Sequence, residues 1–329
     1  MVTIKEVAKR AGVHPSTVSR ALSGKIPVDE ETKQKVMEAV EALNYQPNVL
    51  AKGLKEGKTN TIGLIIPNIQ NPIFPAVARG VEDEARKAGF TVILCNTDED
   101  LAVERNYVDK LQKRWVDGII FATASDKSEH ILTLKQNNFP VVLLVRHMGK
   151  EVDAIIADNY QGAYQAAAYL IEKGHRKIAL INGDTSLPLY AERLNGYKQA
   201  HQDAGIVIDE KMILNGVSGY QDGYDAAKQL LNGGAIPDAV FATSDPKAVG
   251  VMRAVKDNGL AVPKDVAVVG FDDLSMSALL DPPLTTVAQP FYEMGAKAAA
   301  RLIALIKNKN QRKPRVDILD TKLVVRNST

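Results

Sequence analysis

The chain has 329 residues, of which 45% are hydrophobic and 24% charged, with 41 basic and 39 acidic side chains. This length and composition are typical of a globular protein with two or three domains, and no apolar run reaches the length of a membrane-crossing helix. The one cysteine, Cys95, excludes an internal disulfide and a thiolate metal cluster. The sequence begins without a secretory leader, so we expect a cytoplasmic protein.

The basic side chains gather at the N-terminus. Residues 1–60 carry ten Lys and Arg against seven Asp and Glu, a net charge of +3, while the remaining 269 residues carry a net charge of −1. Within residues 1–28 the balance is five basic to one acidic. A DNA backbone attracts such a segment because bound cations release counterions. The rest of the chain, by contrast, does not have the charge of a nucleic-acid surface.

The start of the chain predicts two short helices joined by a tight turn. Thr3 and Glu6 stand at the spacing of a capping box, and apolar residues then recur at helical spacing. Gly12 is suited to the left-handed conformation that ends a helix. His14 is the expected N-cap of the second helix, with Pro15 at its first position, where the missing N–H costs nothing. This plan is that of a helix-turn-helix, whose second helix lies in a DNA major groove. The alternative is a surface helical hairpin with ordinary solvated charges.

A third helix is expected after Asp29, which is its N-cap, and the helix should close a small three-helix core. Its apolar stripe consists of Val36, Ala39, Val40 and Leu43. Residues 47–60 follow as an apolar, weakly helical segment that is too short to be a stable helix alone in water. Two interpretations stay open for it. It folds only on DNA, where an apolar side chain can wedge between base steps in the minor groove, or it is a plain linker between domains.

From residue 61 the pattern changes to short apolar runs that alternate with amphipathic helices. Continuous hydrophobicity in such runs is typical of parallel sheets that are buried on both faces. The expected strands are Ile62–Ile66, Val92–Leu94, Gly118–Phe121, Val141–Val145, Ile155–Ala157, Lys177–Ile181, Ala239–Ala242 and Val266–Gly270. A glycine spacing repeats as well, because Gly80 and Gly196 are 116 residues apart, as are Gly89 and Gly205. The sequence therefore predicts two similar α/β lobes with a cleft between them.

Several stretches are more specific than these patterns. The runs TIKEVAKRAGVHPSTVSRAL and LNYQPNVLAKGL, together with the ending LVVRNST, resemble the lactose/galactose repressor (LacI/GalR) family of bacterial transcription regulators, and the resemblance covers the whole chain. It implies a small all-α helix-turn-helix head plus a two-lobed, periplasmic-binding-protein-like α/β body with parallel sheets. The implied parts are a head of residues 1–46, a hinge helix and linker of residues 47–60, a first lobe of residues 61–158 and 289–316, and a second lobe of residues 159–288 and 317–329.

The resemblance also implies which residues contact DNA. They are Thr3, Pro15, Ser16, Thr17, Ser19, Arg20, Tyr45, Asn48, Ala51 and Leu54. By this resemblance Leu54 is the minor-groove wedge, and Ala51 packs against the hinge of a second subunit. Pro15 departs from the family, which often has a polar or aromatic residue at this base-contacting position. A proline offers only apolar contact there, as to a thymine methyl group.

Ligands of two-lobed parallel sheets bind beyond the carboxyl ends of the strands. The family's effector positions match Phe74, Arg146, Asp158, Arg193, Ser244 and Asp272. Arg193 offers a planar fork of donors and Asp272 a paired acceptor, which suits a polyhydroxy ligand, while two arginines in one cleft would favour an acid. A sugar, a sugar acid and a sugar phosphate therefore all stay open. The alternative roles are structural, because strand-end acids such as Asp158 often cap the next helix and Phe74 is equally suited to a core.

The function implied by the resemblance is repression of transcription by a homodimer on a near-palindromic operator, under the control of a small molecule. The sequence has no P-loop, G-x-S-x-G or H-E-x-x-H motif, and its five histidines lack metal-ligand spacing, so we expect no catalysis, no metal and no cofactor. Two alternatives stay open. One is a regulator of the catabolite-control type, whose corepressor is a protein; the other is a solute-binding receptor. The lack of a basic run around residues 298–305 disfavours the first, and the basic head disfavours the second.

Overall fold

The computed structural model describes residues 2–23, 27–45, 59–113, 116–233, 236–308 and 313–329. The chain forms two compact units, Met1–Thr59 and Asn60–Thr329. The predicted hinge helix, with Asn48, Ala51 and Leu54, lies outside the described residues. Among the helices that are described, none has the length and hydrophobicity that crossing a membrane requires.

The N-terminal unit contains the three predicted helices. They are α1 (Ile4–Ala11), α2 (Pro15–Ser23) and α3 (Glu30–Ala42). The capping box is confirmed, since Thr3 donates to the Glu6 carboxylate from its N–H at 2.7 Å and from its hydroxyl at 2.9 Å. Gly12 has φ = +67°, and Asp29 accepts a hydrogen bond from the Thr32 N–H at 2.8 Å. The apolar core of the unit consists of Val7, Ala8, Val18, Val36 and Ala39.

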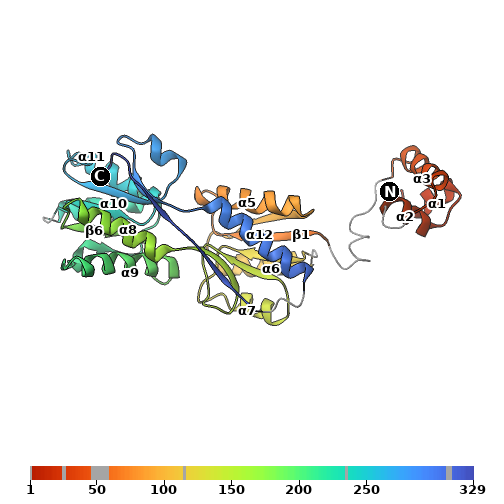
Figure 1. Ribbon diagram of the computed structural model, residues 1–329, viewed down its shortest axis with the longest axis horizontal. Coiled ribbons are helices and arrows are strands. Elements are labelled where there is room, and N and C mark those ends of the chain that lie inside the picture. Colours follow the sequence, from red (N-terminus) through yellow and green to blue (C-terminus); the bar gives the residue numbers. More distant parts are fainter. Residues whose placement is uncertain (1, 24–26, 46–58, 114–115, 234–235, 309–312) are drawn as a thin grey trace. The chain divides into compact units, whose positions relative to one another are not determined.

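The first lobe is built on a six-stranded, fully parallel sheet with the order β11-β5-β4-β3-β1-β2. Its strands are β1 (Thr61–Ile66), β2 (Thr91–Asn96), β3 (Gly118–Phe121), β4 (Val141–Leu144), β5 (Asp153–Ala157) and β11 (Val316–Leu319). Helices α5 (Ile73–Lys87) and α12 (Phe291–Lys307) cover one face, and α6 (Leu101–Lys113) and α7 (Glu129–Gln136) cover the other. Figure 1 shows α12, in blue, beside the orange α5, although they are far apart in the sequence.

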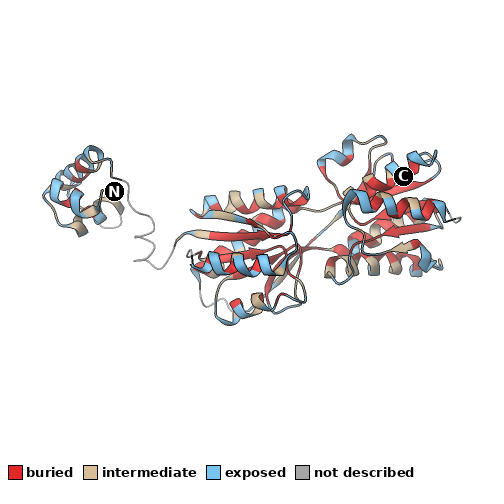
Figure 2. Cartoon of the chain, turned by 180° about the vertical axis from the view of Figure 1, so that it is seen from behind, coloured by how far each residue is buried: buried red, intermediate tan, exposed pale blue. Residues whose placement is uncertain are grey.

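The second lobe repeats this plan with the strand order β12-β10-β9-β8-β6-β7, in which only β12 is antiparallel to its neighbour. Its strands are β6 (Ile178–Ile181), β7 (Ile213–Leu214), β8 (Ala239–Ala242), β9 (Ala267–Asp272), β10 (Thr285–Ala288) and β12 (Lys322–Val324). Its helices are α8 (Asn159–Glu172) and α9 (Pro188–Asp203) on one face, and α10 (Gly219–Asn232) and α11 (Asp245–Asp257) on the other. Buried residues run along the inner strands of both sheets, while the edge strands β2, β7, β11 and β12 are mostly half-buried or exposed (Figure 2).

The chain passes between the lobes three times: from β5 to α8, from β10 to α12, and from β11 to β12. The assignment of residues 317–329 to the second lobe is wrong for 317–319, because β11 extends the free edge of β5 by parallel pairing from Val316 to Leu319. Two of these crossings are bonded to each other. The Asp158 N–H donates to the Leu319 carbonyl at 2.9 Å, and the Thr321 hydroxyl donates to the Asp158 carbonyl at 3.3 Å.

Candidate functional site

In the N-terminal unit, α2 carries most of the predicted DNA-contacting residues of the described part. Ser16, Ser19 and Arg20 are exposed and Thr17 is half-buried, while Val18 on the opposite face is fully buried in the core. Pro15 starts the helix, as predicted. The helix therefore presents hydroxyl and guanidinium groups to solvent, which is the kind of face that contacts base edges and phosphates.

Thr3 and Tyr45 have structural roles beside their predicted DNA contacts. The Thr3 hydroxyl is used in the capping box, and the hydrogen bonds from Thr3 lower the pKa of Glu6. Tyr45 is half-buried against the core of the three helices. Their DNA contacts stay a prediction.

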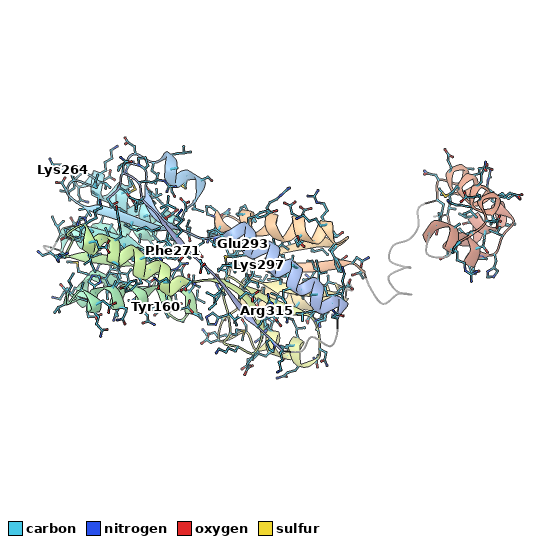
Figure 3. The ribbon with its side chains drawn as sticks, viewed as in Figure 1. Tyr160, Lys264, Phe271, Glu293, Lys297 and Arg315 are labelled. Carbon is cyan, nitrogen blue, oxygen red and sulfur yellow. The ribbon has the colours of Figure 1, made fainter. Side chains whose placement is uncertain are left out.

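In the second lobe, Arg193 lies buried on α9 with 3% of its surface exposed. Its Nε and Nη2 donate to the Asn159 Oδ1 at 3.0 and 2.8 Å, and its Nη1 donates to the Thr243 carbonyl. The guanidinium carbon lies 3.8 Å from the centroid of the Phe271 ring, a cation–π contact. Burial lowers the pKa of Arg193, and the nearby Asp272 charge opposes that shift. Arg193 is thus held in one orientation by three neutral groups: the Asn159 amide, the Thr243 carbonyl and the ring of Phe271, which is labelled in Figure 3.

The close packing of α9 against α8 places this arginine. A Cβ atom at Gly196 would collide with the carbonyl oxygen of Tyr160, so only glycine allows the two backbones to approach so closely. Arg193 is on α9 one turn before Gly196, and Asn159 is at the start of α8, one residue before Tyr160. The helix crossing therefore sets the distance between the Arg193 guanidinium and the Asn159 amide.

Asp272 ends β9 with φ = +126°, a backbone conformation that side-chain-bearing residues rarely adopt and that is frequent at functional sites. Its Oδ1 accepts a hydrogen bond from Gln289 Nε2 at 2.7 Å, and 6% of its surface is exposed. Burial raises the pKa of Asp272 to about 7, while the Arg193 charge works in the opposite direction. Asp272 is therefore an acceptor whose charge changes near neutral pH.

Two further charged residues, Asp245 and Lys247, lie near Arg193 and Asp272 at the start of α11. Asp245 is fully buried and accepts hydrogen bonds from the Ser277 and Thr286 hydroxyls, both at 2.6 Å; burial raises its pKa to about 6. The Lys247 ammonium, also buried, donates to the Ser244 hydroxyl at 3.2 Å and lies 4.7 Å from the Tyr190 ring centroid. Two cations and two carboxylates thus lie near one another at the carboxyl ends of β8 and β9.

The first lobe contributes differently to the predicted set. Arg146 is buried and pairs with the Glu99 carboxylate through two hydrogen bonds, one of them 3.0 Å long. Phe74 is 3% exposed and belongs to the core of the first lobe. Asp158 caps α8 by accepting from the Gln161 N–H at 2.9 Å. The structure therefore brings together Arg193, Ser244 and Asp272, and it gives Phe74 and Asp158 packing and capping roles.

Sequence reasoning missed four residues beside these groups, namely Asn159, Glu192, Lys247 and Gln289. One of them carried a usable signal. Lys247 precedes Val251, Ala254 and Val255 at helical spacing, so it lies on the buried face of α11. Asn159 and Gln289 adjoin the lobe crossings that the family resemblance placed after residues 158 and 288, but nothing in the sequence singled out their side chains. No group of three or more metal-ligating side chains occurs in the parts of the chain that the structure describes.

Comparison with known proteins assigns both units. A family model described as "Bacterial regulatory proteins, lacI family" matches residues 3–48, and one described as "Periplasmic binding proteins and sugar binding domain of LacI family" matches residues 59–326. Catabolite control protein A of Priestia megaterium is 37% identical over 310 residues, which cover 94% of this chain and 93% of that protein.

Two solved structures are similar in fold and in sequence. One is the lac repressor dimer bound to operator and the anti-inducer ONPF, with a TM-score of 0.90 and 28% identity, covering 100% of this chain and 99% of that chain. The other is a LacI family transcriptional regulator from Enterococcus faecium with bound ribose, with a TM-score of 0.73 and 31% identity, covering 82% of this chain and 98% of that chain. The chain belongs to the LacI family of DNA-binding bacterial transcription regulators and is not an enzyme.

Proposed function

We propose that this protein represses transcription by binding a near-palindromic operator as a homodimer, and that a small sugar-like effector controls this binding from the cleft between the two lobes. The observation that carries the proposal is the group of buried Arg193, buried Asp272 and half-buried Ser244 in a chain with a helix-turn-helix head. Two heads on one dimer match the two half-sites of a palindrome. The operator-bound lac repressor dimer and the ribose-bound regulator support both parts.

On the DNA side, α2 enters the major groove with Ser16, Ser19 and Arg20 toward the bases and phosphates. Leu54, Ala51 and Asn48 keep the roles that the family resemblance gives them, with Leu54 as the minor-groove wedge. Effector binding changes the arrangement of the two lobes and so the spacing of the two hinge segments. A coupling free energy of about 1–3 kcal/mol is enough to change operator affinity markedly.

The charges near Arg193 favour a neutral polyhydroxy effector over an acid. Arg193 and Lys247 are balanced in number by Asp245 and Asp272. The argument for an acid required a second unpaired arginine, and Arg146 is already paired with Glu99. A sugar hydroxyl can accept from a cation and donate to Asp272 in the same contact. We therefore place neutral sugars ahead of sugar acids and sugar phosphates.

A selection of duplexes from a random pool tests the operator part. The full chain should enrich a near-palindromic sequence, and removal of the first 58 residues should abolish that selectivity. Sedimentation should show a dimer. Calorimetry with D-ribose, cellobiose, gluconate and glucose 6-phosphate then ranks the effector classes, and a bound sugar should change operator affinity. A chain that binds sugars but enriches no duplex would instead be a solute-binding receptor.

Control by a protein corepressor is the second candidate, because catabolite control protein A is among the relatives. The structure offers little for such a partner on residues 298–305 of α12. Arg301, the basic residue of that stretch, pairs with the buried Asp153 at 2.6 Å, and Lys297 one turn earlier pairs with Glu293 at 3.0 Å (Figure 3). A phosphorylated carrier protein should therefore leave operator affinity unchanged, and an increase would favour this candidate.

A further inference from the structure

A row of hydrogen bonds runs from Arg193 in the second lobe to His147 in the first. The Asn159 Oδ1 accepts two bonds from Arg193, at 3.0 and 2.8 Å. The Asn159 Nδ2 donates to the Ala157 carbonyl at 3.1 Å and to the Glu192 Oε2 at 3.2 Å. The other carboxylate oxygen of Glu192, Oε1, lies 3.0 Å from the His147 Nε2. Glu192 is on α9 and His147 follows β4, so this last bond joins the two lobes.

The direction of each bond in the row is fixed by its neighbours. The Gly149 N–H donates to the His147 Nδ1 at 3.2 Å, so that nitrogen is an acceptor and the proton of the neutral ring is on Nε2. His147 therefore donates to Glu192. At the other end, Asn159 cannot reverse its amide, because its NH₂ group would then face two N–H donors of Arg193. Glu192 thus receives one donor from each lobe.

Because Asn159 is buried in the middle of this row, its hydrogen bonds depend on the position of Arg193 at one end. Asn159 is 3% exposed, so water does not easily replace a partner that it loses. If Arg193 turns toward a ligand, the Asn159 Oδ1 loses both of its donors, and the amide is held only by its Nδ2 bonds to the Ala157 carbonyl and to Glu192. An amide held on one side only can rotate, and rotation removes the Nδ2 donor from Glu192. The carboxylate that holds His147 is then positioned from one side only.

We propose that Asn159 and Glu192 are positioning residues that link the hydrogen-bonding state of Arg193 to the contact between the lobes at His147. The inference deepens the proposed function, in which Arg193 binds the effector, because it names the route by which that contact reaches the first lobe. It predicts that a change confined to Arg193 alters how the lobes are held, even though both hydrogen-bond acceptors of Arg193 are in the second lobe.

Distances between spin labels in the full chain, without effector or DNA, test the link. Labels on Glu129→Cys in α7 and Asn232→Cys in α10 report one position in each lobe, and both sites are exposed while the natural Cys95 is buried. Glu192→Gln keeps the side-chain shape, but its NH₂ group faces one of the two donors. It should give longer and broader interlobe distances. Glu172→Gln, an equal charge change at an exposed site of the same lobe, should leave them unchanged.

Arg193→Lys tests the far end of the row. Lysine keeps the positive charge but lacks the fork that donates twice to Asn159. The interlobe distances should shift in the same direction as in Glu192→Gln, and the double variant should shift no further than either single one. Arg253→Lys, at an exposed ion pair with Asp257, is the control. If Glu192→Gln shifts the distances and Arg193→Lys does not, or if neither does, the proposal is overturned.

If Arg193→Lys fails to fold, a further variant, Asn159→Asp, tests the link between Arg193 and the interlobe contact. Asn159→Asp keeps an acceptor for Arg193 but replaces the donor to Glu192 with a second carboxylate oxygen. Interlobe distances should again lengthen, and unchanged distances would contradict the link. None of these measurements uses DNA or a sugar, so their outcome is independent of the operator selection and calorimetry that test the proposed function.

Discussion

Both lobes carry a buried arginine near the end of a strand, but the two side chains have different partners. Arg146 in the first lobe is held by two hydrogen bonds to the Glu99 carboxylate, whose side chain is about half exposed. Arg193 in the second lobe is held by neutral oxygens of Asn159 and Thr243 and by the face of Phe271. The positive charge of Arg146 is neutralised by direct contact, and that of Arg193 is not.

This difference is the one we expect between a structural arginine and a ligand-binding one. A buried charge without a contacting counter-ion is costly, so the site gains most when a ligand or a nearby carboxylate completes it. For Arg193 the nearby carboxylate is Asp272, which is itself buried and has a raised pKa. Both arginines match effector positions of the family, so the sequence alone does not distinguish their roles. Their different partners are the reason that we propose Arg193, and not Arg146, as the main effector-binding arginine.

The largest expected effect is on effector binding after replacement of each arginine by methionine, which keeps the apolar stem. Arg193→Met removes charge-assisted hydrogen bonds worth roughly 1.5–3 kcal/mol each, so effector affinity should fall about 100-fold or more. Arg146→Met leaves Glu99 half exposed to water, and affinity should fall by less than about 10-fold. Calorimetry with the sugar that changes operator affinity measures both. Equal losses would show that the two arginines share one role.

The second prediction concerns two glycines at equivalent helix crossings. A Cβ at Gly196 would collide with the Tyr160 carbonyl, and one at Gly80 would collide with the Tyr292 carbonyl in the first lobe. Each substitution to alanine should lower the free energy of unfolding by about 1–3 kcal/mol, as overpacking usually does. Only Gly196→Ala moves Arg193 and should also weaken effector binding. Urea denaturation and calorimetry separate the two effects, and loss of binding in Gly80→Ala would contradict the assignment.

The third prediction follows from the pKa of Asp272, which burial raises from 3.8 to about 7. Between these two pH values the folded chain binds a proton that the unfolded chain has lost, so stability falls as pH rises from about 4 to about 7. Asp272→Asn has no carboxyl group at this position, so its stability lacks this dependence on pH. The melting temperature of the natural protein, relative to that of Asp272→Asn, should therefore be lower at about pH 8 than at about pH 5.

Effector binding should depend on pH in the opposite sense. An ionised Asp272 accepts a sugar hydroxyl better than a protonated one, so affinity should rise through about pH 7 in the natural protein and stay flat in the variant. If the affinity of the two proteins changed with pH in the same way, Asp272 would not take part in effector recognition.

Local chemistry explains which parts of the fold were predictable. The capping box of Thr3 and Glu6, the turn at Gly12 and the cap at Asp29 each depend on residues a few positions apart, and all three are confirmed. The eight expected strands lie within the observed strands or within one residue of them. Seven of them are buried on both faces, and such strands show as continuous apolar runs, whereas β2 is an edge strand whose Leu94 is exposed. The position of β11 was wrong because its apolar pattern does not say which sheet edge it joins.

The chemistry of the site was predictable only in part. The family resemblance predicts Arg193, Ser244 and Asp272 as effector positions, and this stays a prediction, although the structure brings the three residues together. The sequence could not show that Arg146 has a partner 47 residues away, or that Asn159 bonds to Glu192, because these contacts form only when each lobe has folded. The contact between Glu192 and His147 requires in addition that the two lobes meet. Lys247 is an intermediate case, because its helical spacing indicated burial and only the structure gave it a partner.

The smallest expected effect on stability comes from Glu99→Gln, and it tests the comparison of the two arginines most directly. The ion pair is partly exposed, so its loss should change the free energy of unfolding by no more than about 1 kcal/mol. The substitution nevertheless removes the carboxylate that neutralises Arg146, while a Gln oxygen can still accept one bond. If that pairing is what makes the site favour neutral sugars, Glu99→Gln should raise the affinity for gluconate relative to ribose. Glu129→Gln, exposed in the same lobe, is the control. An unchanged ratio in calorimetry would mean that Arg146 does not face the effector in either state, and that the second lobe alone sets the charge of the ligand.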